Sequence, residues 1–257
     1  MGLVAISKTD HMDKALSGNR NYSFAKDRIV VPICEFELIM MAATIPLLFM
    51  RSNASVQLYG LLGLQTGKNL FVKPDGSWSA RFKPAVLSCH PFSLGKLDDG
   101  RHTIVFDEDS EFIVDRDQGY PFFEEDGSVG GVINHYTKLL SDITHSLPRV
   151  KEACSLLDDF GLLMPFDHAI KKKDGGVVRL DGLLAVNKER FLKLKGDEFL
   201  KLRDTCAINL IYAHYFSQVN FHSLMDSMNA YDRASSSLKE IGLNIFQGKD
   251  EGLDFNF

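Results

Sequence analysis

The sequence lacks the long apolar segment that a transmembrane helix or a secretory signal requires. The most apolar window, residues 33–50, is interrupted by Glu35, Glu37 and Pro46, whereas a spanning helix needs about 20 nearly uncharged residues. The first 20 residues also lack the uninterrupted apolar core of a signal peptide. We therefore expect no membrane span, no export by the signal-peptide route and a cytoplasmic location.

Clustered basic charge, closely spaced cysteines and complete metal-binding or catalytic motifs are also missing. The formal net charge is −5 and the longest basic run is residues 171–173, which argues against a nucleic-acid partner because phosphate neutralisation needs clustered Lys and Arg. The four cysteines stand too far apart for a CxxC pair and are expected to be reduced thiols. Neither HExxH nor GxSxG occurs. We expect no metal and no other cofactor.

Two segments approach known ligand-binding motifs without completing them. Residues 63–69 are similar to a phosphate loop, but the first glycine is one place late and Asn69 stands where a magnesium-binding hydroxyl belongs. His11 and Asp13 have the HxD spacing of a two-histidine, one-carboxylate iron site. They lie in a segment expected to be mobile, however, and such iron sites need a rigid element.

The sequence predicts an α+β fold, with a β-rich N-terminal half packed against a helical C-terminal half. Period-two runs separated by Gly and Asp favour an antiparallel sheet between residues 56 and 114, including a strand over 85–89 and a hairpin over 71–82 with an Asp-Gly turn. A short helix is expected over residues 35–44, with Phe36, Ile39, Met40 and Ala43 sharing one face.

The periodicity becomes helical after residue 131. Two helices are expected to meet at Pro148, because proline cannot continue the helical hydrogen bonds. Asn187 can cap a further helix, and a final helical region is expected over residues 205–228.

The chain is expected to form a single domain over residues 22–230, preceded by a mobile leader over 1–21. Residues 231–257 are expected to form an extension that ends in an acidic, aromatic tail. Such a tail can serve as a docking peptide, but an unattached terminus is the favoured interpretation. Nine acids and one base between residues 107 and 126 give a local charge of −8, which is interpreted as a solvated loop.

The last long helix carries polar residues on an apolar face. His214 and Ser217 share that face with Leu210, Phe221 and Leu224, at steps of three or four residues. Buried polar side chains need hydrogen-bond partners, so a structural role is favoured. A pocket at this face is the alternative.

Several short segments, in order along the chain, resemble the SapC family of bacterial proteins, over most of residues 22–224. They include Tyr22-Ser-Phe-Ala, Glu35-Phe36, Asn69-Leu-Phe-Val, Asp75-Gly-Ser-Trp78 and Ile211-Tyr-Ala-His214 with Ser217 and Asn220. The chain departs from the family pattern at residues 88–90, before Pro91-Phe92. The resemblance implies an accessory role without an established reaction, and the family name implies an association with the cell surface.

The sequence is therefore consistent with two functions. The first is a non-enzymatic binding or accessory protein for a peptide or protein partner, acting through the acidic loop or a sheet face at Trp78 and Phe82. The second is an enzyme with an unfamiliar site, with or without a metal, around the His214 and Ser217 helix face. Its residues would be Glu35, Asn69, His90, His214, Ser217 and Asn220. The oligomeric state is left open.

Overall fold

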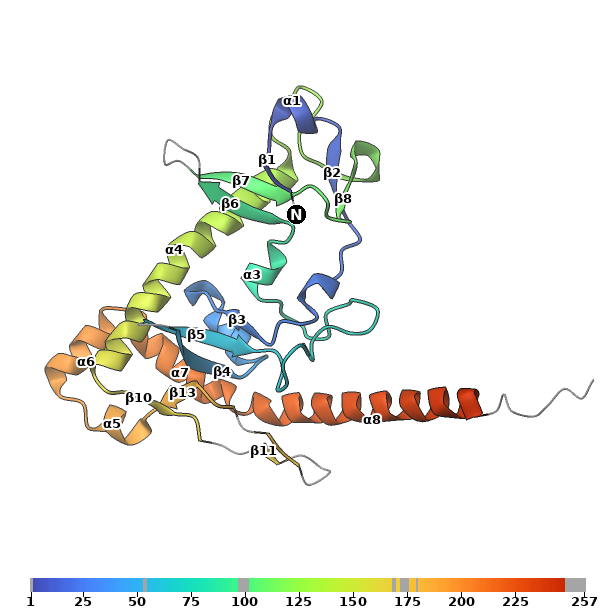
Figure 1. Ribbon diagram of the computed structural model, residues 1–257. Helices are drawn as coiled ribbons and strands as arrows, with labels where there is room; N and C mark the ends of the chain where they lie inside the picture. The colour runs from blue at the N-terminus through green and yellow to red at the C-terminus, as the bar shows by residue number, and fades with distance from the viewer. Residues whose placement is uncertain are drawn as a thin grey trace, which may run out of the picture.

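The computed structural model describes residues 2–52, 55–96, 102–167, 170–171, 176–178 and 180–247, with the side chains of the last helix described as far as residue 233. Within these residues the chain has the predicted α+β fold, with most strands in its N-terminal half and most helices in its C-terminal half (Figure 1).

The largest sheet has five antiparallel strands in the order β10-β13-β4-β5-β3. Its central strand is buried on both faces: Leu47 and Phe49 belong to a core with α4 and α7, and Leu48 belongs to one with α8. The strands are β3 (Val30–Pro32), β4 (Leu47–Ser52), β5 (Ser55–Leu61), β10 (Leu163–Pro165) and β13 (Leu183–Val186). A separate short pair is β11 (Ile170–Lys171) and β12 (Val177–Val178).

Two three-stranded sheets, in the orders β1-β7-β6 and β8-β2-β9, form a second core. Their strands are β1 (Leu3–Ala5), β2 (Lys14–Ser17), β6 (Phe92–Lys96), β7 (His102–Asp107), β8 (Ile113–Asp115) and β9 (Gly119–Pro121). The expected mobile leader is thus wrong for residues 3–17. These residues pair with strands about 100 positions later and bury Ala15 and Leu16, a long-range pairing that local polarity does not reveal.

The acidic stretch likewise belongs to this second core and is not a free loop. It contains β8, β9 and a 3-10 helix over Arg116–Gln118. Arg116 donates hydrogen bonds to the carbonyl oxygens of Met12 (3.0 Å) and Phe123 (2.7 Å). The one base of the stretch therefore anchors it to the N-terminal segment.

A single long helix, α4 (Gly131–Asp159), joins the two cores (Figure 1). The predicted break at Pro148 is wrong. Proline in a helix costs about 3 kcal/mol, whereas each fully buried aliphatic side chain contributes about 1.5–3 kcal/mol. Apolar residues on both sides of the proline are buried, which outweighs that cost. They are Ile133, Leu140, Ile143, Val150, Ala153 and Leu157.

The remaining helices correct three further expectations. Residues 85–89 were expected to be a strand but form α3 (Ala85–Ser88), whose first amide donates to the buried carboxylate of Glu37. The last helical region is divided into α7 (Ala207–Ser217) and α8 (Asn220–Gln247), and α8 continues past residue 231. The others are α1 (Lys8–His11), α2 (Leu38–Ala42), α5 (Lys188–Leu192) and α6 (Gly196–Arg203), with 3-10 turns η1 (Ser23–Ala25) and η2 (Glu35–Glu37).

Local turn and cap predictions agree better with the structure. Asn187 caps α5 by accepting the Arg190 amide at 3.0 Å. The Asp-Gly turn of the predicted hairpin is present, with Gly76 at φ +79°, but the hairpin is reduced to one bridge between Val72 and Trp78. Among the described residues, no helix combines the length and apolarity needed to cross a membrane. The acidic, aromatic tail lies outside the described residues.

Candidate functional site

His214 and Ser217 on α7 lie in the sealed core. The Val186 amide donates to His214 Nε2 at 3.3 Å, so Nδ1 carries the ring proton and donates to the Leu47 carbonyl at 2.8 Å. Ser217 Oγ accepts the Leu47 amide at 2.9 Å and donates to the His214 carbonyl at 2.7 Å. Both side chains are fully engaged, which supports the structural interpretation.

These bonds fill a gap between β4 and β13. The ladder pairs Leu184 with Phe49, so the same register would place Val186, two residues further on, opposite Leu47. The imidazole of His214 bridges these two residues instead. Burial lowers the pKa of His214 to about 4, which keeps the ring neutral at physiological pH.

Asn69, Trp78 and His90 also have structural partners. The Asn69 amide group donates to the Ala25 carbonyl (3.0 Å) and accepts the Phe71 amide (2.9 Å). Trp78 Nε1 donates to the Phe82 carbonyl at 2.9 Å. His90 is half-buried and stacks on Phe24 with 3.9 Å between ring centroids, and burial lowers the pKa of His90. Because His214 and Ser217 are sealed in the core, the six residues of the enzyme hypothesis do not line one shared pocket.

Glu35 and Asn220 do come together, in a groove of about 560 Å³ between α2 and α7. Its rim is formed by three strongly exposed apolar side chains: Ile39 is 88% exposed, Phe216 69% and Val219 66%. Its remaining apolar lining is Leu38, Ala42, Ala43, Tyr212 and Ala213. We call this surface the α2/α7 groove.

The polar groups of the α2/α7 groove form hydrogen bonds and an ion pair with neighbouring elements. The Glu35 carboxylate pairs with Arg149 at 3.2 Å, and the Glu35 amide donates to Ser146 Oγ at 2.7 Å. Asn220 Nδ2 donates to the Ala42 carbonyl at 2.7 Å, which joins the end of α2 to the start of α8. Among the described residues that line the groove, Glu35 is the only charged side chain.

Sequence reasoning grouped four apolar residues on one helix face without identifying them as a surface. The side chains that α2 buries are Leu38, Met41 and Ala42, while Phe36, Ile39, Met40 and Ala43 are exposed. The sequence does contain a sign of this exposed surface, because the segment is apolar on both faces of the helix. Periodicity alone does not say which of two apolar faces meets the core.

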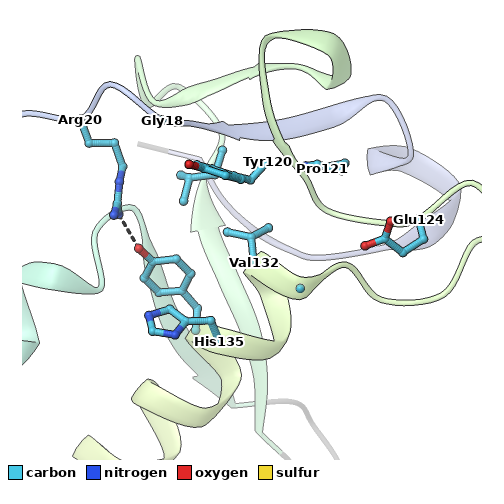
Figure 2. A pocket seen from close by; sticks show the side chains of 10 residues that line it. Gly18, Arg20, Tyr120, Pro121, Glu124, Val132 and His135 are labelled. Carbon is cyan, nitrogen blue, oxygen red and sulfur yellow. Dashed lines mark hydrogen bonds between the residues drawn. The ribbon is translucent and has the colours of Figure 1, made fainter.

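A second pocket, of about 620 Å³, lies between β2, β9 and the first turns of α4 (Figure 2). Its walls carry Arg20, Tyr120, Glu124 and the buried Tyr136, whose hydroxyl accepts a hydrogen bond from Arg20. None of these residues was a candidate from the sequence. Arg20 fell in the expected leader, and the partners of that segment come from strands more than 80 residues later.

The described residues offer no reactive thiol and no cluster for a metal ion. All four cysteines are free and buried. Burial raises the pKa of Cys34, Cys89 and Cys154 to about 12 and that of Cys206 to about 11, so the thiols stay protonated at neutral pH. Within the described part of the chain, no three His, Cys, Asp or Glu side chains lie close enough to hold a metal.

Comparison with known proteins identifies the family but no individual relative. No curated protein and no solved structure matches the chain. The family model SapC matches residues 6–224, which include β2, the five-stranded sheet, α4 and α7. Because this match covers most of the sequence, the chain belongs to the SapC family.

Proposed function

We propose that the protein binds a partner protein by accepting an amphipathic helix of that partner in the α2/α7 groove. The observation that carries the proposal is the exposure of Ile39, Phe216 and Val219 around one groove. Single exposed apolar residues are ordinary, but large apolar side chains that gather at a groove mark interaction sites.

The energy available at the groove fits a modest protein interaction. Burying an aliphatic or aromatic side chain contributes about 1.5–3 kcal/mol, so the three rim residues together supply about 4–9 kcal/mol. A complex with a dissociation constant of 1 µM corresponds to about 8 kcal/mol, and association also costs free energy. The apolar side chains of the helix bury a similar area in the same contact. With both sides counted against the cost of association, an isolated helix is expected to bind in the micromolar range.

The shape and charge of the groove favour a helix with a basic end. Two helices flank it, and small residues at Ala42, Ala43 and Ala213 leave room for a third backbone to approach. A helix laid in an apolar groove is a recurrent mode of peptide recognition. Glu35 is the only charged group among the described lining residues. Its ion pair is with an Arg149 side chain that is 65% exposed, and such a solvent-screened pair is weak, so a Lys or Arg at the corresponding end of the partner can share the Glu35 carboxylate.

The experiment uses synthetic amphipathic Leu/Ala/Gln helices of about 18 residues, long enough to be helical, that carry lysines or glutamates at one end. Binding to the full-length protein is measured by fluorescence anisotropy of the labelled peptides. We expect micromolar binding of the lysine form and binding weaker by about threefold or more for the glutamate form, as a surface ion pair is worth up to about 1 kcal/mol.

Substitutions then locate the binding surface. Ile39→Asp and Phe216→Asp are expected to weaken binding at least tenfold, because each places a charge in the apolar contact. Leu192→Asp is the matched control, since Leu192 is an exposed leucine on α5 outside the groove, and it should leave binding unchanged.

Two results would overturn the proposal. One is equal binding by the wild type and the two groove variants. The other is a wild-type dimer in light scattering that Phe216→Asp converts to a monomer, which would show that the groove holds a second copy of the chain.

A further inference from the structure

We infer that the second pocket, beside β2 and β9, binds a small zwitterion such as a short peptide with free ends. In this arrangement the ligand carboxylate meets Arg20 and its ammonium group meets Glu124. The pocket volume of about 620 Å³ lies within the range of about 300–1,000 Å³ that is usual for small-molecule sites. The site is separate from the α2/α7 groove.

Arg20 is held in place by neutral groups alone. Its guanidinium donates to the hydroxyl of Tyr136 and to the carbonyl oxygen of His90. Burial raises the pKa of Tyr136, so the phenol stays neutral. Among the described residues no carboxylate forms an ion pair with Arg20. The guanidinium is therefore positioned but has no carboxylate in an ion pair with it among the described residues, and carboxylates are its best partners.

Tyr136 makes a firm support for that cation because it is itself fixed. Its ring is buried in the second core and packs on Phe92 with 4.7 Å between centroids. The Arg20 guanidinium carbon lies 5.6 Å from the centre of the same ring, within cation–π range. Less side-chain entropy is then lost when an anion binds.

The middle of the pocket is apolar and its far end is acidic. Figure 2 shows Arg20 and Glu124 at opposite ends, with Tyr120 and Val132 between them. The Tyr120 ring lies beside Gly18, where an added Cβ would be 3.5 Å from it. Tyr120 is otherwise exposed and offers its ring to the body of a ligand.

The described lining also includes the imidazole of His135 (Figure 2), but Arg20 and Glu124 are the two side chains of opposite charge that select the ligand class. A phosphate ester or a dicarboxylate would bring a second negative charge toward Glu124, and like charges at close range are unfavourable. A ligand with one carboxylate, one ammonium group and an apolar body complements Arg20, Glu124 and Tyr120 at once.

The probe is the dipeptide leucyl-phenylalanine, titrated into the full-length protein by calorimetry and by NMR. Its N-acetyl form lacks the ammonium group and its C-terminal amide lacks the carboxylate. Free leucine tests whether a single amino acid is long enough to reach both charges. If free leucine binds as tightly as the dipeptide, the result still supports a zwitterion site. Each blocked form is expected to bind more weakly by about threefold or more, because Arg20 and Glu124 are exposed and an ion pair with an exposed side chain is only modestly stabilising.

Variants assign the two charges. Arg20→Met should make binding indifferent to amidation of the carboxylate, and Glu124→Gln should make it indifferent to acetylation of the amine. Arg81→Met, which removes an exposed arginine outside the pocket, should bind like the wild type. No binding at millimolar dipeptide, or equal binding of the free and blocked forms by the wild type, would overturn the inference.

Discussion

Replacing His214 by leucine tests the imidazole bridge between β4 and β13. The substitution leaves the buried Val186 amide without its acceptor, whereas the Leu47 carbonyl keeps a hydrogen bond from Gln218 Nε2 at 3.1 Å. One buried unsatisfied donor costs about 1–3 kcal/mol. At pH 7 the free energy of unfolding of His214→Leu should therefore be lower than that of the wild type by about 2 kcal/mol.

The same histidine makes the wild type sensitive to acid. The pKa of His214 is about 4 in the folded protein, against 6.5 for an ordinary histidine. The unfolded chain therefore binds more protons below pH 6.5, and stability is lost as the pH falls from 6.5 towards 4. At about 1.4 kcal/mol per pH unit, the wild type loses about 3 kcal/mol by pH 4. The leucine variant lacks this loss, so the two stabilities should become equal near pH 5.

The assay is urea unfolding of both proteins at pH 7, 6, 5 and 4, followed by circular dichroism. His222→Leu serves as the control because His222 is exposed on α8, and its stability should follow that of the wild type at every pH. Parallel curves for the wild type and His214→Leu, with no crossing, would refute the assignment of a neutral, bridging imidazole.

Two further predictions concern other buried polar contacts. Glu37→Leu should lower the free energy of unfolding by about 2–4 kcal/mol, because the amides of Cys34 (3.0 Å) and Ala85 (2.7 Å) both lose their acceptor. Glu37→Gln, which keeps one oxygen, should cost less in the same urea titration, and equal losses would contradict this account. Lys68→Met should speed hydrogen exchange in residues 224–233 of α8 several-fold, since it removes the 2.8 Å ion pair with Asp232. Unchanged exchange would show that this pair does not anchor α8.

The features that the sequence could predict depend on neighbours within a few positions. The cap at Asn187 and the turn at Gly76 each follow from short-range chemistry. The α+β class follows from the change of periodicity after residue 131. The helix break predicted at Pro148 is wrong because the cost of a proline is a local property. The burial of apolar side chains that outweighs this cost comes from two cores that the sequence does not show.

The candidate sites were harder to predict because they depend on tertiary contacts. Glu35 and Asn220 were both identified, yet they are 185 positions apart, and only the packing of α2 on α7 brings them to one groove. His214 was correctly described as a buried group that needs partners, but those partners, Leu47 and Val186, lie on other elements. Arg20 was missed because its surroundings come from β9 and α4.

The position of α4 between the two cores also sets the order in which the protein can mature during synthesis. The first 130 residues contain both three-stranded sheets and β3, β4 and β5, but each core takes part of its apolar wall from α4. The five-stranded sheet stays incomplete until β13, residues 183–186, has been made. Apolar surface of the second core thus stays uncovered until α4 has been made, and that of the five-stranded sheet until β13 has been made. Such surface is what chaperones recognise and what aggregates.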